Sequence, residues 1–259
     1  MRLPVLLLIC SLTWAGLPAQ QISYKFYPKV DYPVLLGSTL LSLGGNWLKV
    51  TTPVLTESQV EFYLLHPPPR FDRIAIDLRS STASEASDYT GYLAWGLMLS
   101  TYAFKGVRKE WKIHTVMLWE SLMVTETFTS LTKSLIRRPR PYVYQPDRPV
   151  ESKQRPNDRH SFISGHTSSS AAAGFYFAQI FHDHFPDSKW RIPVWILGAG
   201  VPAVTGFLRV RAGKHFPSDV IAGYLVGGLV GMAVPRLHSW ENRSGLSLQV
   251  GLSGLSLTF

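Results

Sequence analysis

The order of hydrophobic and polar residues along the chain predicts a protein built mainly from helices. After residue 30, apolar residues recur at helical spacing in seven segments, which Gly, Pro or charged residues separate. The predicted helices cover Pro33–Lys49, Glu57–His66, Asp88–Lys105, Trp111–Ile136, His166–Phe185, Ile192–Val210 and Ser218–Val234. Five of them are apolar on nearly every side, so we expect protein or lipid to surround each one.

The end of the chain has a different period. Between Gly245 and Phe259, apolar residues alternate with small or polar ones up to Leu252, and they alternate again after Ser253–Gly254. Alternation with a period of two on both sides of such a pair predicts a β-hairpin. A strand that ends in an aromatic residue also resembles the last strand of an outer-membrane barrel, but one hairpin cannot close a barrel. We expect the hairpin to pack on the helices or to pair with a partner.

The first residues are typical of a secretory signal. Arg2 precedes an apolar run from Leu3 to Ala15, and small residues follow near Ala19. An uncleaved membrane anchor is the alternative. The only cysteine, Cys10, lies inside this run and follows the bulky Ile9, which argues against a lipidated signal. Cleavage would leave a chain without disulfide or thiolate chemistry.

No long repeat or low-complexity linker divides the rest of the chain, which favours a single domain. The predicted organisation is a signal peptide over residues 1–19, a helical or loop extension over 20–87, a helical bundle over 88–236 and a tail with the hairpin over 237–259.

The helices suit either a membrane or a soluble bundle. Their uninterrupted apolar stretches are about 13 to 16 residues long, shorter than the roughly 20 that a spanning helix needs, and Glu120 interrupts one of them. The basic loop Lys105–Lys112, however, is typical of the cytoplasmic side of a membrane. The alternating helices would then place the polar segments Lys133–Arg140, Ser164–His166 and Arg209–Asp219 together on the periplasmic side. A soluble periplasmic bundle would also bring these segments together.

Composition and charge narrow the class of partner. The chain is 46% apolar and carries a formal net charge of +9, which implies an anionic partner such as nucleic acid, a lipid headgroup or a phosphorylated small molecule. The basic residues cluster in loops between apolar segments and form no exposed stripe with interleaved aromatic residues, which argues against nucleic acid.

Three polar clusters lie between the apolar helices, and each has an ordinary structural explanation. The segment Lys133–Pro141 holds four cations at the end of a predicted helix, where cations are favoured in any case. The segment Ser161–His166 opens a helix whose free N–H groups could bind an anion or could simply be capped. In the third cluster, Asp219 follows His215 by four residues. This spacing lets Asp219 accept the proton on one imidazole nitrogen and leave the other free to attack.

As a set, the clusters resemble the signature of the type 2 phosphatidic acid phosphatase (PAP2) and vanadium haloperoxidase superfamily, which reads Lys-x6-Arg-Pro, Pro-Ser-Gly-His and Ser-Arg-x5-His-x3-Asp. The matching residues are Lys133, Arg140, Pro141, Ser164, Gly165, His166, Arg209, His215 and Asp219. Two positions depart from the pattern: Ile163 replaces the proline and Leu208 replaces the serine. Neither change removes an ionisable group, so we expect activity to survive both. The resemblance implies an all-α fold, a helical bundle of the PAP2/haloperoxidase type, here with a short C-terminal β-hairpin.

The resemblance also implies roles for these residues. The implied catalytic residues are His166, His215 and Asp219, and the implied phosphate ligands are Lys133, Arg140, Ser164, Gly165 and Arg209. His215 would attack phosphorus to give a phosphohistidine, and His166 would protonate the leaving oxygen and then activate water. The scheme needs no metal or other cofactor, and vanadate is expected to inhibit as a phosphate mimic. It requires a neutral His215 and a protonated His166, which predicts a bell-shaped pH profile.

The resulting prediction is a metal-independent phosphatase of the bacterial cell envelope, membrane-associated with its site facing the periplasm. Its substrate would be a phosphomonoester or diphosphate of a lipid such as phosphatidic acid or a polyprenyl diphosphate. One alternative is a soluble periplasmic acid phosphatase. A second is a vanadium haloperoxidase, although those chains are usually longer. A third is a catalytically silent lipid-binding scaffold, but the intact histidine pair argues against it. Arg159 and His160 are expected in a solvated loop. The oligomeric state is not predicted.

Overall fold

The computed structural model describes residues 23–239, 247–251 and 254–258. The predicted signal peptide, with Cys10, lies outside the described residues. The helices, in chain order, are α2 (Pro28–Val50), α3 (Glu57–Leu65), α4 (Arg70–Arg73), α5 (Ser81–Ser100), α6 (Lys105–Lys109), α7 (Trp111–Ile136), α8 (Gly165–His184), α9 (Arg191–Arg211) and α10 (Pro217–His238). Short 3₁₀ helices are η1 (Thr101–Ala103), η2 (Pro141–Tyr144), η3 (Val150–Lys153) and η4 (Pro156–Arg159). The helical bundle that the sequence predicts is therefore confirmed.

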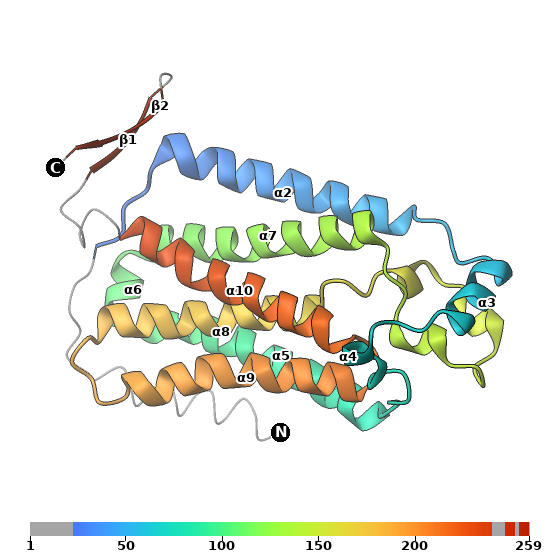
Figure 1. The fold of residues 1–259 in the computed structure, drawn as a ribbon. Helices are drawn as coiled ribbons and strands as arrows, with labels where there is room; N and C mark the ends of the chain where they lie inside the picture. The colour runs from blue at the N-terminus through green and yellow to red at the C-terminus, as the bar shows by residue number, and fades with distance from the viewer. Residues whose placement is uncertain (1–22, 240–246, 252–253, 259) are drawn as a thin grey trace.

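The long helices α2, α5, α7, α8, α9 and α10 run side by side along one axis (Figure 1). Helix α8 occupies the centre, because it packs against α5, α7, α9 and α10 and most of its residues are buried. Helix α2, which the sequence placed in an extension before the bundle, lies along α7 at the edge.

Small residues let the neighbours approach α8 closely. A Cβ atom at Gly198 of α9 would lie 2.5 Å from the carbonyl oxygen of Gly174 in α8. Similarly, a Cβ atom at Gly223 of α10 would lie 2.7 Å from the carbonyl oxygen of Ser164, at the start of α8. Larger side chains at these two glycines would push α9 and α10 away from the central helix, and the site described below depends on both contacts.

Helix α5 differs from its predicted range. It begins at Ser81, where the hydroxyl of Ser80 accepts a hydrogen bond from the backbone N–H of Ala83 at 3.1 Å. The sequence placed the start at Asp88, because the first turns are rich in Ser and Ala and lack apolar periodicity. Ser80 is a favourable N-cap residue, so local capping decides the boundary.

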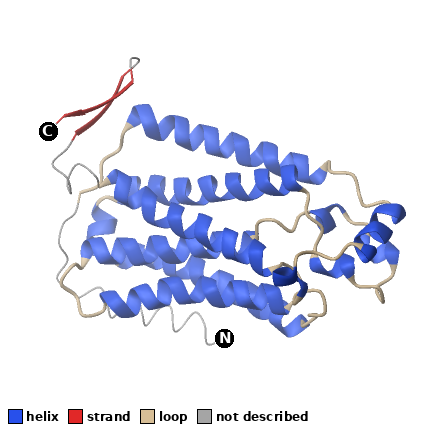
Figure 2. Cartoon of the chain, viewed as in Figure 1, coloured by secondary structure: helices blue, strands red, loops and turns tan. Residues whose placement is uncertain are grey.

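The tail contains the strands β1 (Ser247–Gly251) and β2 (Gly254–Thr258), which pair antiparallel with Ser247 opposite Thr258. Figure 2 shows that helices make up the rest of the described secondary structure.

The outer faces of several helices are strongly apolar. Helices α9 and α10 are long and apolar enough to cross a membrane, judged by length and composition. Large apolar side chains exposed on α2, α9 and α10 include Leu36, Leu40, Leu43, Ile192, Ile196, Phe207, Ile221, Leu225 and Leu229. A protein surrounded by water rarely exposes such extended apolar surfaces.

Candidate active site

Predicted site residues from four parts of the chain meet at one end of the bundle. Lys133 comes from the last turn of α7, Arg140 from the loop that follows, Arg209 from the last turn of α9 and His215 from the loop before α10. Each is at most 7% exposed. The Nη1 atom of Arg140 lies 3.5 Å from the Nε2 atom of His215. The predicted convergence of the three polar clusters is thus observed.

The surroundings of His215 keep its imidazole neutral. Its Nδ1 atom lies 2.8 Å from the carbonyl oxygen of Ser161, so Nδ1 carries the proton and Nε2 the lone pair. Burial, followed by the positive charges of Arg140, Lys133 and Arg209, holds the pKa of His215 well below its usual value of 6.5. A neutral imidazole with a free Nε2 atom is the form that a nucleophile requires.

The predicted hydrogen bond between His215 and Asp219 is absent. The Oδ2 atom of Asp219 lies 3.7 Å from Nδ1 of His215. It accepts instead from the hydroxyl of Ser161 at 2.5 Å and from the backbone N–H of Phe216 at 2.9 Å. The free N–H group at the start of α10 competes for the carboxylate, and Ser161 lies between the two side chains. Asp219 therefore acts on His215 through Ser161, whose hydroxyl it fixes while the carbonyl of Ser161 orients the ring.

Arg138, which the sequence did not single out, fixes Asp219 from the other side. Its Nη1 atom donates to Oδ1 of Asp219 at 2.5 Å, and its Nη2 atom donates to Oδ2 of Asp72 in α4 at 2.6 Å. Asp72 also accepts from the backbone N–H of Ser218 at 3.0 Å. The ring of Phe216 lies 4.2 Å from the guanidinium carbon. Arg138 belongs to the basic segment Lys133–Pro141. Its partner Asp72 is 66 residues away, so no local motif could predict the pair.

Lys133 and Arg140 are buried cations whose partners are neutral. Lys133 donates to the carbonyl oxygen of His160 at 3.2 Å. Arg140 donates to the carbonyl and side-chain oxygens of Asn157, both at 3.0 Å, and to the carbonyl oxygen of Lys214 at 3.0 Å. Within the described part of the chain, neither side chain has a carboxylate within 4.0 Å. Buried charges are costly without a counter-ion, so this arrangement favours an anion between them.

Asp88 lies next to the other two ionisable groups of the site, His166 and Arg209. Its Oδ1 atom lies 3.0 Å from Nε2 of His166 and 3.8 Å from Nη1 of Arg209. Arg209 also donates to the hydroxyl of Ser87 at 3.2 Å, while its buried Nε atom has no hydrogen-bond partner among the described residues. No pattern in the sequence points to Asp88 beyond its place at the predicted start of a helix.

His166 does not have the protonation state that the sequence predicted. Burial and the positive charge of Arg209 lower its pKa to about 4, against the opposing effect of Asp88. In the absence of an anion, the ring is therefore neutral at neutral pH. His166 is the more accessible of the two histidines, because 45% of its side chain is exposed whereas His215 is almost fully buried.

Ser164 and Gly165 lie at the start of α8, next to the cations. The hydroxyl of Ser164 shares a hydrogen bond with that of Thr167 at 2.8 Å, and its N–H donates to the carbonyl oxygen of Asp219 at 3.0 Å. The hydroxyl of Ser164 can accept from Thr167 and donate to phosphate as predicted, whereas its N–H is already used. A Cβ atom at Gly165 would lie 3.9 Å from Nζ of Lys133, so the glycine borders the cation directly.

The expectation that His160 lies in a solvated loop is wrong. Its side chain is 2% exposed, and its Nε2 atom lies 3.3 Å from the hydroxyl of Thr52. Burial, with Lys133 as the next cause, lowers the pKa of His160 to about 4. The loop folds over the end of α7 instead of extending into solvent, because its carbonyl groups bind the buried cations. Arg159, the other residue of this expectation, is half-buried.

Two cavities border the site. A cavity of about 530 Å³ between α5 and α8 is lined by Asp88, Gly91, Tyr92, Trp95, Gly96, Leu99, Gly165, His166 and Ser169. A cavity of about 570 Å³ is more polar, and its lining includes Arg79, Glu85, Tyr142, Asp147, Arg148 and Lys214. The first cavity offers mainly apolar surface next to His166. The second offers charged groups and includes Lys214, which precedes His215 in the chain.

The chain is similar to known proteins in sequence and in structure. A lipid A 4'-phosphatase from Porphyromonas gingivalis is 32% identical over 80 residues, which make up 31% of this chain and 30% of that relative's length. A solved structure, the transmembrane PAP2 type phosphatidylglycerolphosphate phosphatase from Bacillus subtilis, is 19% identical and aligns over 94% of this chain and 98% of that chain, with a TM-score of 0.46. The sequence profile of the PAP2 superfamily matches residues 114–243, about half of the chain, and this segment contains every predicted site residue. The chain belongs to the PAP2 superfamily.

Proposed function

We propose that the protein is a phosphatase that binds the phosphoryl group of its substrate among Lys133, Arg140 and Arg209 and transfers it to His215. The observation that supports this most strongly is the burial of Lys133 and Arg140 with only neutral partners, beside a neutral imidazole. A phosphoryl group supplies the missing negative charge, and the guanidinium groups can bind its oxygens in pairs. The site thus favours an oxyanion.

The reaction proceeds in two displacements. The Nε2 lone pair of His215 attacks phosphorus as the bond from phosphorus to the leaving oxygen breaks, and His166 donates a proton to that oxygen. Water then attacks the phosphohistidine and gives a proton to His166, which releases phosphate and restores neutral His215. The carbonyl of Ser161 retains the Nδ1 proton throughout. The carboxylate of Asp219, 3.7 Å from Nδ1, stabilises the positive charge that develops on the ring.

Substrate binding sets the protonation of His166. Arg209 and Lys133 lower its pKa in the free protein, so a bound phosphoryl dianion, which offsets their charges, raises it. The proton needed by the leaving group is thereby taken up together with the substrate. Three cations provide the charge that a metal ion would otherwise supply, so the reaction needs none, and vanadate inhibits by occupying the same positions.

The two cavities support a lipid phosphate as substrate. Tyr92, Trp95 and Leu99 line the cavity beside His166, whose largely apolar surface suits an acyl or prenyl chain. Arg148 and Lys214 line the polar cavity, which suits the rest of a charged headgroup. We place the substrate among phosphomonoesters or diphosphates of lipids, such as phosphatidic acid or a polyprenyl diphosphate. The name of the Porphyromonas gingivalis relative, lipid A 4'-phosphatase, indicates a lipid substrate for that protein.

The apolar outer faces support a position in the membrane of the cell envelope. Helices α9 and α10 would span the bilayer, and the exposed apolar side chains of α2 would contact lipid. The basic segment that forms α6 lies at the end of the bundle opposite the site (Figure 1). Basic loops stay on the cytoplasmic side, which orients the site toward the periplasm. A soluble periplasmic enzyme would leave these apolar faces in water.

The apolar cavity provides a test of the lipid substrate. A Cβ atom at Gly91 would meet no atom within 4 Å, so Gly91→Phe can fill the cavity without disturbing the helices. Gly44→Phe, on the outer face of α2, is the matched control because its Cβ position is equally open. Phosphate release would be measured from phosphatidic acid in mixed micelles and from p-nitrophenyl phosphate. We expect Gly91→Phe to raise KM for the lipid roughly tenfold and to leave the soluble substrate and the control unchanged.

The same assay separates the alternatives. Preference of the wild type for p-nitrophenyl phosphate would indicate a soluble-type acid phosphatase, and halide oxidation by the vanadate-loaded protein would indicate a haloperoxidase. Wild-type protein that releases no phosphate from either substrate would favour the silent scaffold and refute the proposed activity.

A further inference from the structure

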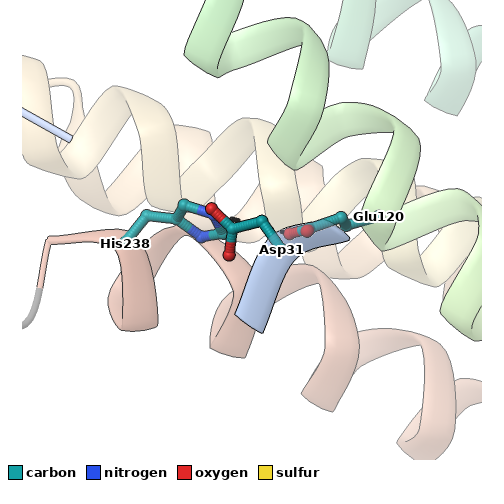
Figure 3. Close-up of side chains that lie close together, drawn as sticks. All are labelled: Asp31, Glu120 and His238. Atoms are coloured by element: carbon teal, nitrogen blue, oxygen red, sulfur yellow. Dashed lines mark ion pairs between the residues drawn. The ribbon is translucent and has the colours of Figure 1, made fainter. Parts of the chain in front are cut away.

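Three buried ionisable side chains that the proposed reaction does not use meet at the other end of the bundle. Asp31 lies in the first turn of α2, Glu120 in α7 and His238 at the end of α10, and their side chains point toward one another (Figure 3). They are 2%, 2% and 5% exposed, respectively. The Nε2 atom of His238 lies 3.5 Å from Oδ2 of Asp31 and 3.5 Å from Oε2 of Glu120.

The ring of His238 is oriented so that its Nε2 atom faces the two carboxylates. Its Nδ1 atom lies 2.9 Å from the carbonyl oxygen of Val234, which can only accept a proton, so Nδ1 carries the hydrogen. The Nε2 atom is therefore the nitrogen that is available to a metal ion, and it has no hydrogen-bond partner among the described residues. The Oε1 atom of Glu120 is likewise buried without a hydrogen-bond partner. The Oδ2 atom of Asp31 accepts from the backbone N–H of Tyr27 at 2.7 Å. The two atoms without a partner, together with this carboxylate, favour a cation among them.

The distances fit a metal ion better than direct hydrogen bonds. A separation of 3.5 Å exceeds the usual range of about 2.7–3.2 Å for N–H···O bonds. It is close to the edge of a tetrahedron around zinc, about 3.3–3.4 Å when the zinc–ligand distances are about 2.0–2.1 Å. One ligand atom from each residue lies within 4.8 Å of the other two. A backbone carbonyl that accepts from the second imidazole nitrogen is also the usual support of a metal-bound histidine.

We propose that Asp31, Glu120 and His238 bind a zinc ion that cross-links α2, α7 and α10. Imidazole and carboxylate groups are ordinary zinc ligands, and three of them leave a fourth position for water. A cavity of about 510 Å³ adjoins the three residues and gives that position room. Helix α2 packs mainly on α7 and lies at the edge of the bundle, so a bond through zinc to α10 would tie it to the core. The zinc ion would cross-link the helices at the end of the bundle opposite the phosphate-binding cations.

Metal content provides the direct test. The full chain, purified in detergent, would be stripped with EDTA, loaded with zinc chloride, passed through a desalting column and analysed by inductively coupled plasma mass spectrometry. We expect about one zinc ion per chain in the wild type and less than about a tenth of that in His238→Gln and in Glu120→Gln.

His184→Gln is the matched control. His184 is also buried, and its Nδ1 atom lies 3.0 Å from the carbonyl oxygen of Ile180, but no carboxylate lies within 4.0 Å of its ring in the described chain. This variant should retain the zinc. His215→Ala should retain it as well, which shows that the ion is not held by the phosphate site.

Thermal unfolding gives a second readout that does not depend on the variants being folded. Removing zinc from the wild type should lower Tm by roughly 5–10 °C, and adding it back should restore the value. Two results would overturn the proposal: wild-type protein that retains no more zinc than His238→Gln, or a wild-type Tm that EDTA leaves unchanged. The second result would indicate a protonated His238 shared between the carboxylates.

Discussion

The two ends of the helical bundle have opposite electrostatic imbalances. At one end, Lys133 and Arg140 are buried with neutral oxygen partners only. At the other end, the buried carboxylates of Asp31 and Glu120 each have an oxygen 3.5 Å from the Nε2 atom of His238. Excess positive charge calls for an anion and excess negative charge for a cation. The sign of an uncompensated buried charge therefore indicates the kind of ligand that each end favours.

Replacing the nucleophile should produce the largest effect. His215→Ala leaves the cations in place but removes the Nε2 lone pair, so we expect kcat for phosphatidic acid to fall by at least about 10³-fold. Phosphate release in mixed micelles measures the change. His66→Ala, in an exposed position at the end of α3, is the control and should keep wild-type activity. A His215→Ala protein within tenfold of wild type would mean that the cationic end is not the reaction centre.

Removing the charge of Lys133, a buried cation without a counter-ion, should lower activity but raise stability. Lys133→Met keeps the volume of the side chain but removes its charge, so we expect activity to fall by about 10²-fold and the free energy of unfolding to rise by about 1 kcal/mol or more. Lys49→Met is the contrast, because the ammonium group of Lys49 lies 3.7 Å from the carboxylate of Glu126. The control should gain no stability and keep most of its activity. If both variants changed activity and the free energy of unfolding equally, the missing counter-ion of Lys133 would not explain its role.

Unlike Lys133 and Arg140, Arg138 is a cation that has carboxylate partners, Asp72 and Asp219. Arg138→Ala leaves Asp72 and Asp219 without their shared cation, so we expect a loss of about 3–5 kcal/mol in stability. Because Asp219 holds Ser161 and thereby the ring of His215, kcat should also fall roughly 10- to 100-fold with KM unchanged. Arg138→Lys should recover part of kcat, which a purely structural role would not predict. Kinetics below the unfolding transition and thermal melts measure the two effects.

A substitution at the Asp31, Glu120 and His238 end of the bundle should lower stability without slowing the reaction. His238→Gln removes the proposed zinc ligand, so we expect a lower Tm while kcat, measured below the unfolding transition, stays within about threefold of wild type. The decrease in Tm should disappear when wild type and variant are compared in EDTA. A large loss of kcat in this variant would show that the two ends are coupled.

The smallest expected effect is on the pH dependence of stability, compared between wild type and His215→Gln. The folded protein keeps His215 neutral because its pKa lies well below 6.5, whereas the unfolded chain binds a proton there as the pH falls below that value. The unfolded state therefore binds more protons, and stability should decrease with falling pH from 6.5 downward. Removing this proton uptake in His215→Gln should flatten the slope by up to about 1.4 kcal/mol per pH unit.

Denaturation at a series of pH values, with and without saturating inorganic phosphate, measures this effect. Bound phosphate offsets the cations and raises the pKa of His215, so it should also flatten the slope of the wild type. Identical slopes for wild type and His215→Gln would contradict a neutral, buried ring.

The sequence was informative where the relevant spacing is local. Seven helices were predicted from apolar periodicity, and all seven are present, because periodicity is fixed by neighbouring residues. The site residues were found through short motifs, such as the spacing of His215 and Asp219. The same spacing misled about their contact, because Ser161 and the start of α10 compete for the carboxylate.

The groups that the sequence did not reveal are paired over long distances. Asp88 contacts His166 across 78 residues, and Arg138 contacts Asp72 across 66. No periodicity connects residues that lie on different helices.

By itself, the sequence determined that the chain forms apolar helices with a cationic, histidine-bearing set of loops at their ends, because helix formation and motif spacing are properties of adjacent residues. Only the tertiary structure decided which charges remain uncompensated. Whether a buried lysine or carboxylate has a counter-ion depends on which helices pack together, and in this bundle that packing brings Asp31, Glu120 and His238 within reach of one another from helices at the start, middle and end of the chain.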